Sequence, residues 1–499
     1  MIRDIARCWA GLAGSSCGSA GFRCGVGAVV CAGLVGGAAM GQDLTVKAPP
    51  QHGTICIYDA AIHPISGPDI AKGYVVFTDG KIVEVGAGEP RVPAGGAPGY
   101  AAIDAKGEHV YPGLVGAYSQ MGMTEIQSVA ASIDTSETGA ITPEVRAATA
   151  VNPDSTLIPV TRSNGVLVCG VFPQGGTIAG QPSVIRLEGW TSADMTMAGS
   201  IGLAVRWPSS RGFGRFGGGG GGDEAAGREA KVIADAFDAA EAYAKQRDAD
   251  PSAPTDIRWE AMRGVFPDAV GQLMRELGRA PDVEALGAQP ESANFARQGR
   301  LYISANDVDQ ITSAVAFCGE RHLKCVIVGG RDAALCADLL KEKDVPVIVM
   351  GTHRMPRRED AAYDEAYTLP ARLFAAGVKF AIANGDETAH ERNVPYEAAT
   401  AVAYGLPMEA GVKSVTLWPA EILGVADQVG SLESGKSATL IVTTGNPLEV
   451  TSNVVRAFVD GREIDLSNKQ TKLAEKYRER YRQMGMLKGG TGSEAAGGK

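Results

Sequence analysis

Short apolar stretches separated by Gly, Asp and Pro mark both ends of the chain. Residues 54–111 largely alternate apolar and polar positions, as in "GYVVFTDGKIVEVG", and Asp79-Gly80 inside that stretch is a hairpin signal. Short apolar stretches between turn residues also occur near the other end, in "GSLESGKSATLIVTTGNP" and "VVRAFVDGREIDL". The pattern therefore predicts a small β-sandwich that combines residues 44–111 with residues 420–465.

Between these ends, strand-like and helix-like stretches alternate. The near-continuous apolar runs "RLYISAND", "LKCVIVGG", "VPVIVMG" and "VKFAIANGDE" are each followed by a helical pattern. Successive βα units with right-handed crossovers form either a doubly wound sheet or a closed barrel. No GxGxxG opens a helix after a strand, so a dinucleotide-binding sheet has no support. We therefore predict an α/β fold with a (β/α)8 TIM-like barrel over residues 112–419.

Two segments do not follow this alternation of strands and helices. Residues 209–256 contain six consecutive glycines at 217–222, which predict a flexible, lid-like insertion, followed by an Ala-rich helical stretch. A phosphate cradle is disfavoured there, because no Lys-Ser/Thr follows the glycines. Residues 466–499 are predicted to form a charged terminal helix and a disordered tail.

The first 41 residues have the pattern of a secretory signal peptide. Three arginines precede the weakly apolar run "GVGAVVCAGLVGGAA", and "AMGQD" places small residues before a possible cleavage point. The expected location is therefore periplasmic or extracellular. Five cysteines lie beyond residue 41 and none forms CxxC, so we expect buried free thiols rather than a disulfide framework.

Charge narrows the class of partner. The chain of 499 residues carries 47 Lys and Arg against 57 Asp and Glu, a net charge of −10. Nucleic-acid binding needs a basic footprint, which this balance does not provide. The prediction is a small-molecule ligand and no nucleic acid.

The closing part of the chain resembles the amidohydrolase superfamily, in particular its imidazolonepropionase-like and dihydroorotase-like branches. The motifs that carry the likeness are "TLWPAEILG" and "GSLESGKSATLIV", together with "GKIVEVG" and "YPGLVGAYSQ" nearer the start. Thr439 stands where the family usually has Asp. The resemblance implies hydrolysis of a carbon–nitrogen bond in a non-peptide or cyclic amide, with one or two divalent metals at the mouth of the barrel.

The metal ligands that the resemblance implies are mostly replaced. The family places His-x-His on the first barrel strand, one His on each of strands five and six, and an Asp on strand eight. The matching positions here are Tyr118, Gln120, Ser304, Gly329 and Asp386, so only the Asp is kept. A ligand from strand four cannot be placed, because the glycine-rich insertion obscures that region. The interpretation is a degenerate metal site in which Asp386 is the candidate catalytic base and Tyr118, Gln120 and Ser304 contact the substrate.

The chain could still bind a metal if its ligands are rearranged. His353 follows the seventh strand and His390 follows the eighth, close to Asp386, so these three could hold one zinc or manganese ion. In the alternative, His353 is a loop residue, His390 belongs to a helix start and no metal binds. Arg354 in "RMPRRED" is a candidate for binding a carboxylate or phosphate group, or else part of a solvated loop.

Two functions follow from these residues. One is a retained hydrolase with a shifted or metal-free site, in which Asp386 is the base and Tyr118 donates a hydrogen bond to a carbonyl. The other is a pseudoenzyme that binds a small ligand or an active amidohydrolase partner. Barrels of this superfamily commonly oligomerise, so we expect a homo-oligomer or a pairing with an intact relative.

Overall fold

A computed structural model describes most of the chain, and the described residues belong to one compact unit. They are residues 42–43, 45–90, 99–209, 222–266, 299–356, 361–385 and 387–487. The predicted signal peptide, the glycine run up to residue 221, Asp386 and the predicted disordered tail from residue 488 lie outside them. Nothing in the structure therefore tests those predictions.

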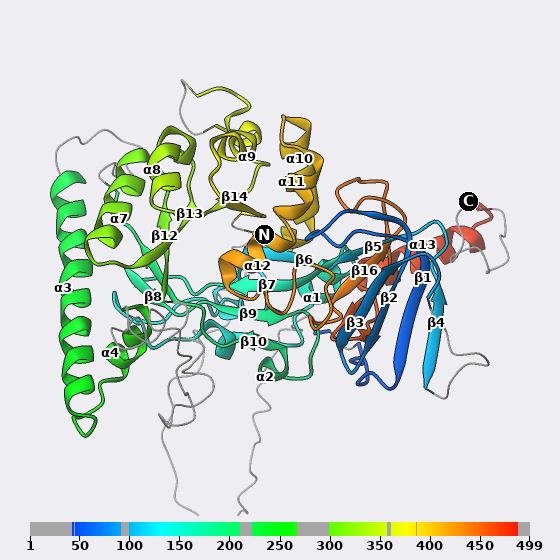
Figure 1. Cartoon of the computed structure of the whole chain (residues 1–499), viewed down its shortest axis with the longest axis horizontal. Helices are drawn as coiled ribbons and strands as arrows, with labels where there is room; N and C mark the ends of the chain where they lie inside the picture. The colour runs from blue at the N-terminus through cyan, green and yellow to red at the C-terminus, as the bar shows by residue number, and fades with distance from the viewer. Residues whose placement is uncertain are drawn as a thin grey trace, which may run out of the picture. The chain divides into compact units, whose positions relative to one another are not determined.

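Both ends of the chain contribute to one eight-stranded sheet, as the sequence predicts (Figure 1). Its path is β18-β17-β16-β5-β1-β2-β3, with β4 paired to β1. The strands are β1 (Thr54–Ile62), β2 (Ile70–Thr78), β3 (Lys81–Ala87), β4 (Tyr100–Asp104), β5 (His109–Pro112), β16 (Leu440–Thr443), β17 (Val454–Val459) and β18 (Arg462–Glu463).

The sheet is connected throughout, whereas the sequence predicted a sandwich of two sheets. The first half of β1 pairs with β4 and its second half pairs with β5, with Asp59 at φ 59° between the two halves. This branching lets one sheet surround its own core, in which Phe77 and Phe458 meet edge to face at 5.2 Å. The Asp79-Gly80 hairpin is confirmed, since both residues have positive φ, as a type I′ turn requires.

The predicted barrel region contains two further sheets. One has the order β10-β9-β7-β6 and the other has the order β15-β14-β13-β12-β11-β8. Their strands are β6 (Leu114–Ser119), β7 (Val166–Val171), β8 (Ile178–Gly180), β9 (Ser183–Arg186), β10 (Thr196–Ala198), β11 (Leu203–Arg206), β12 (Arg300–Ala305), β13 (Lys324–Gly329), β14 (Val347–Met350) and β15 (Phe380–Ala383). Neighbouring strands from β11 to β15 are parallel, as βα units require.

The two sheets curl around a common interior. Inward-facing side chains of β6, β7, β12, β13, β14 and β15 share one apolar cluster with α12 (Leu417–Leu423). The edge strands β15 and β6 lie side by side, and the backbone of Ser414 and Val415 links them. Ile382 N donates to Ser414 O at 3.0 Å and Val115 N donates to Val415 O at 2.8 Å. The arrangement is a TIM-barrel-like α/β fold, but the described strands do not form a continuous hydrogen-bonded ring of eight, so the predicted closed barrel is shown only in part.

Helices follow the strands on the outside. They are α1 (Leu157–Arg162), α2 (Ser192–Met195), α3 (Gly222–Ala249), α4 (Ile257–Met262), α7 (Val308–Glu320), α8 (Ala337–Glu342), α9 (Glu365–Ala376), α10 (Val394–Ala403), α11 (Met408–Lys413) and α13 (Lys469–Gln483). Short 3₁₀ turns are η1 (Ala130–Ser132), η2 (Ala147–Ala150), η3 (Arg263–Val265), η4 (Ala333–Leu335) and η5 (Thr388–Asn393). No described helix is long and apolar enough to cross a membrane.

One boundary differs from that expected. Residues 420–423, predicted to begin the second β-segment, complete α12, and Tyr302 donates a hydrogen bond to Ile422 O at 2.9 Å. The helical stretch predicted after the glycines is confirmed, since α3 is a 28-residue helix. It buries Ile233 and Phe237 at helical spacing, and the Phe237 ring lies 5.4 Å from Phe317 of α7. This stretch is therefore a docked outer helix.

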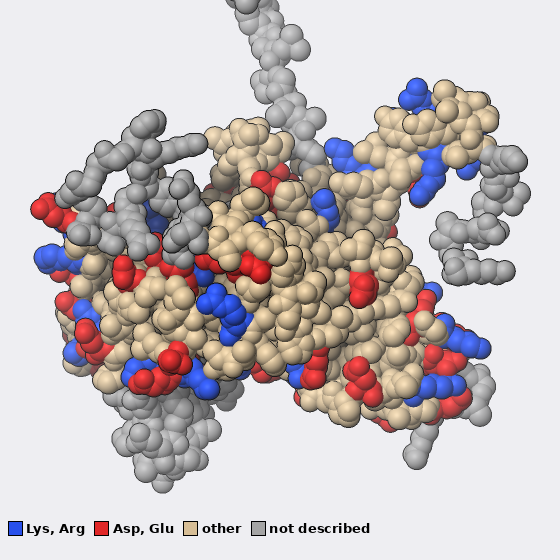
Figure 2. Space-filling model, turned by 90° about the horizontal axis from the view of Figure 1, so that it is seen from above, with Lys and Arg blue, Asp and Glu red and all other residues tan. Residues whose placement is uncertain are grey.

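Cysteine and charge predictions have different outcomes. All five cysteines beyond residue 41 are free and buried, as expected. Acidic and basic side chains are interspersed on the face shown in Figure 2. Lys231 and Asp235 of α3 are an exposed example, 2.8 Å apart. The prediction that nucleic acid is not a partner rests on net charge alone and stays a prediction.

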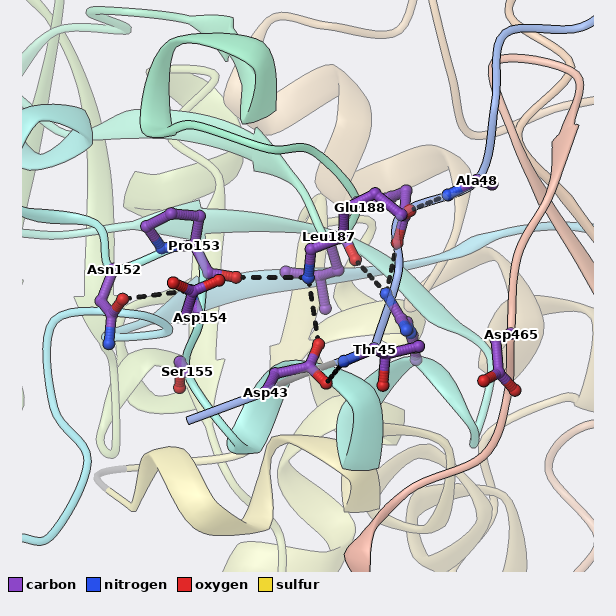
Figure 3. Close-up of polar contacts among 12 residues, drawn as sticks. Asp43, Thr45, Ala48, Asn152, Pro153, Asp154, Ser155, Leu187, Glu188 and Asp465 are labelled. Atoms are coloured by element: carbon purple, nitrogen blue, oxygen red, sulfur yellow. Dashed lines mark hydrogen bonds and ion pairs between the residues drawn. The ribbon is translucent and has the colours of Figure 1, made fainter. Parts of the chain in front are cut away.

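A buried polar network fastens the start of the described chain to the barrel (Figure 3). Lys47 Nζ lies 3.0 Å from Asp43 Oδ2, and both side chains are almost wholly buried. Ala48 N donates to Glu188 Oε1 at 2.9 Å, and Glu188 also forms a buried ion pair with Arg162. The bonds from Ala48 N to Glu188 and from Asp43 N to Asp154 O, the latter at 2.7 Å, make this segment part of the folded domain.

Candidate functional site

A cavity of about 190 Å³ opens at the carboxyl ends of the barrel strands. Its lining comes from β6, β12, β13, β14 and the segments that follow the last four strands of the barrel region. The lining residues are Tyr118, Ser304, Asn306, Val328, Gly329, Arg331, Met350, Arg354 and Gly385. In barrel proteins this end of the strands carries the functional site, so the cavity is the candidate site.

Three of the residues predicted to contact substrate share this cavity. Tyr118, Ser304 and Arg354 all line it. Gln120 lines a smaller neighbouring pocket, which shares Tyr118 and Gly385 with the cavity. Asp386 follows Gly385 in the chain but lies outside the described residues. The structure therefore brings three of the predicted residues together, while their roles stay predictions.

Tyr118 and Gln120, which the resemblance matches to the family's first two histidines, are both held by neighbours. The Tyr118 ring stacks on Phe172 with 4.6 Å between ring centres, and Gln174 Nε2 lies 3.4 Å from its hydroxyl. Gln120 is 8% exposed, and its side-chain oxygen accepts from Thr124 Oγ1 at 3.4 Å. Tyr118 is thus a fixed aromatic wall of the cavity, whereas Gln120 stabilises the loop after β6.

The glycine at the end of β13 is required by its surroundings. Gly329 has φ 103°, and a Cβ built there would lie 2.6 Å from Asn306 Oδ1. A side chain at this position would have to displace Asn306 and adopt a backbone conformation that L residues rarely take. The space beside Gly329 is therefore filled by Asn306, which follows the neighbouring strand β12.

We expect Gly329→Ala to lower the free energy of unfolding by about 2–3 kcal/mol, from strain at positive φ and overpacking together. Gly385→Ala is the matched control, because Gly385 has φ 105° and a Cβ added there would meet nothing within 4 Å. That variant is expected to lose only about 1 kcal/mol. Urea unfolding measures both, and equal losses would show that Asn306 does not restrict the site.

The two candidate histidine ligands face other partners. His353 Nδ1 lies 3.2 Å from Glu397 Oε1, and its Nε2 lies 2.7 Å from Thr400 Oγ1, both on α10. His390 Nδ1 lies 2.8 Å from Glu387 Oε2 at the start of η5. Neither histidine lines the cavity. Among the residues that the structure describes, no three His, Cys, Asp or Glu side chains converge on a metal position.

Glu397 explains why His353 turns away. Its buried carboxylate accepts from the backbone N of Thr352 and of His353, the latter at 2.8 Å, and from Thr352 Oγ1 at 2.7 Å. These bonds draw the loop after β14 onto α10. Sequence spacing offers no sign of this contact, because Glu397 lies 45 residues beyond Thr352.

A buried carboxyl next to the cavity was not singled out from the sequence. Glu391 in η5 is 1% exposed and lines the smaller pocket with Ser119 and Thr388. Burial raises its pKa to about 8; a hydrogen bond from Ser119 lowers it in part, and Glu397 raises it further. Its Oε1 has no hydrogen-bond partner among the described residues. The side chain is therefore mostly protonated at neutral pH.

The described lining of the cavity does not fit a divalent metal. A metal of the kind the family holds needs several His nitrogens or carboxylate oxygens. The lining offers two guanidinium groups, Arg331 and Arg354, which repel a cation, and no imidazole. Its neutral polar groups, from Tyr118, Ser304 and Asn306, are weak zinc ligands. The lining is instead rich in groups that donate hydrogen bonds.

Comparison with known proteins gives a consistent set of matches. Residues 309–464 match the model of the amidohydrolase family. The amidohydrolase tasK of Hapsidospora irregularis is 23% identical over 402 residues, which is 78% of this chain and 39% of that protein. A 5-methylthioadenosine/S-adenosylhomocysteine deaminase of Moorella thermoacetica is 43% identical over 82 residues, 16% of this chain and 18% of that protein. The chain thus spans well under half the length of either curated relative.

A solved structure matches over a larger share of both chains. The crystal structure of an amidohydrolase from Thermotoga maritima MSB8 is 25% identical in sequence and has a TM-score of 0.65. The match covers 82% of this chain and 99% of that chain. The shared arrangement therefore extends over nearly all of that protein.

Proposed function

Since the chain belongs to the amidohydrolase superfamily, we propose that it binds a small amide-type molecule in the mouth cavity without a histidine-held metal. The observation that carries this proposal is the lining of the cavity. Tyr118 and Ser304 stand at the strand ends where the resemblance implies histidines, and they line the cavity together with Arg331 and Arg354. These groups suit the binding of polar and anionic groups, and they do not suit the activation of water by a metal.

Hydrolysis of a carbon–nitrogen bond is the second candidate function. Asp386 favours it, because this residue matches the family's catalytic Asp and directly follows Gly385, which lines the cavity. In that case Asp386 would accept a proton from the attacking water, while Tyr118 would donate a hydrogen bond to the carbonyl oxygen. Export and pairing with itself or with an intact relative stay predictions from the sequence.

Two purified proteins, the wild type and Asp386→Asn, test the two functions. Zinc and manganese would be measured by elemental analysis in the wild type and in Asp386→Asn, before and after incubation with each metal. We expect well under one ion per chain in both proteins. Cyclic amides and N-acyl amino acids, tested with and without added metal, are expected to raise the melting temperature without being hydrolysed.

The opposite results are equally specific. One zinc per chain, lost in Asp386→Asn together with turnover, would replace the first proposal by a metal-dependent hydrolase. Turnover without metal that disappears in Asp386→Asn would support the second candidate. If no ligand of the panel binds at millimolar concentration, both functions are contradicted.

A further inference from the structure

Two arginines from neighbouring strands meet at the cavity. Arg331 follows β13 and Arg354 follows β14, and the two strands pair in parallel with Gly329 opposite Val349. We propose that Arg331 and Arg354 form a binding site for the anionic group of a small organic ligand, a carboxylate or a phosphate. The inference rests on the proposed function, since it names the class of molecule that the same cavity takes.

Small residues line this site at the ends of two strands. Ser304 is the last residue but one of β12 and carries a small hydroxyl side chain, and Gly329, which ends β13, has no side chain. Both residues line the cavity, and at Gly329 the neighbouring Asn306 side chain, itself a lining residue, takes the space that a side chain would need. The positive charge that a metal would supply at this end of the barrel comes instead from the guanidinium groups.

The backbone on either side of Arg331 is fixed. Gly330 N donates to Ala305 O at 2.8 Å, and Asp332 N donates to Asn306 O at 2.9 Å. Gly330 has φ 58°, which allows the tight turn after β13. Arg331 therefore leaves the sheet in a defined direction, which reduces the entropy that ligand binding must overcome.

The loop that carries Arg354 is fixed as well. Arg354 N donates to Thr352 O at 2.8 Å, and Arg354 Nε donates to Gly351 O at 3.3 Å. Thr352 is in turn anchored by Glu397, which is 3% exposed. Buried Glu397 thus acts as a positioning residue for this arginine, through Thr352.

The remaining lining complements an anion attached to a short carbon chain. The hydroxyls of Tyr118 and Ser304 and the amide of Asn306 donate hydrogen bonds, while Val328 and Met350 supply apolar surface. Guanidinium groups bind planar carboxylates and phosphates with paired hydrogen bonds. None of the described lining residues is acidic. The cavity of about 190 Å³ favours a small molecule.

Calorimetric titration with two nearly isosteric probes tests the site. N-acetylglycine carries a carboxylate, and N-acetylglycinamide carries a neutral amide in its place. We expect the carboxylate probe to bind at least about tenfold more tightly. Arg331→Met and Arg354→Met should each weaken N-acetylglycine about tenfold or more and leave N-acetylglycinamide unchanged. Arg372→Met, an exposed arginine of α9, is the matched control and should change neither affinity.

The outcomes separate this inference from the function it rests on. Equal binding of both probes in the wild type and in the arginine variants would overturn the anion site while leaving ligand binding intact. Binding of neither probe, with stoichiometric zinc in the protein, would overturn the proposed function as well. Inorganic phosphate is added as a competitor of N-acetylglycine. If it competes only when both arginines are present, phosphate is the preferred anionic group of the ligand. Urea unfolding of each variant confirms that it is folded.

Discussion

Glu188→Gln is expected to lower the free energy of unfolding by about 3–5 kcal/mol, because it leaves a buried arginine without its counter-charge. Arg162 and Glu188 each have side chains only 1% exposed, and they form an ion pair. The same carboxylate accepts from Ala48 N at 2.9 Å (Figure 3). Urea unfolding at pH 7 measures the loss.

An exposed pair in the same protein provides the control. Lys231 and Asp235 are 2.8 Å apart on α3, and their side chains are 73% and 61% exposed. Asp235→Asn should cost less than about 0.5 kcal/mol, since solvent screens this interaction. Hydrogen exchange at the Ala48 amide should also be faster in Glu188→Gln than in Asp235→Asn. Similar losses in the two variants would mean that the buried pair contributes no more than a surface pair.

Much of the architecture follows from local patterns. Continuous apolar runs such as residues 324–329 predict buried parallel strands, and the structure has β13 over that range. β11 was missed, because its four residues Leu203–Arg206 directly precede the glycine-rich segment and carry little periodicity. The closure of the barrel region is shown only in part, because β15 and β6 lie side by side but are linked through the backbone of Ser414 and Val415 instead of a strand ladder.

The candidate site was predictable where a residue belongs to a strand end. Tyr118 and Ser304 were placed correctly at the cavity for this reason. Arg331 was not singled out, because a charged residue after two glycines resembles any surface turn. His353 was assigned to a metal site, but its orientation depends on Glu397, and no periodicity links two residues 44 apart. Contacts of this kind arise only when separate elements pack.

Replacing Glu391 is expected to remove a large pH dependence of stability. The ordinary pKa of this carboxyl is 4.5, and in the folded protein it is raised to about 8, chiefly by burial. Between these two values the folded state holds a proton that the unfolded state has released. The free energy of unfolding therefore falls as pH rises from about 4.5 to 8 and levels off above that, a total on the order of 5 kcal/mol.

The main cause is burial, which the hydrogen bond from Ser119 offsets only in part, while Glu391 Oε1 has no hydrogen-bond partner among the described residues. Glu391 Oε1 lies against Gly116 of β6, where any Cβ would collide with it, and near buried Cys169. Glu391 also raises the pKa of the Cys169 thiol, after burial itself, because two ionised groups would repel each other there. Gly116→Ala should accordingly be destabilising at every pH, since the added methyl group collides with the Glu391 carboxyl group whether or not it is charged.

Urea unfolding from pH 5 to pH 9 compares the wild type with Glu391→Gln and with the exposed Asp235→Asn control. The wild type and the control should lose stability over this range, whereas Glu391→Gln should lose several kcal/mol less. The other titratable groups are shared by the wild type and Glu391→Gln, so the difference between their curves isolates Glu391. Parallel curves for all three would show that Glu391 is ionised in the folded state. A difference from the wild type that changes with pH for Glu391→Gln, and stays constant for Asp235→Asn, would instead confirm that the folded protein holds a proton on Glu391 in the smaller pocket.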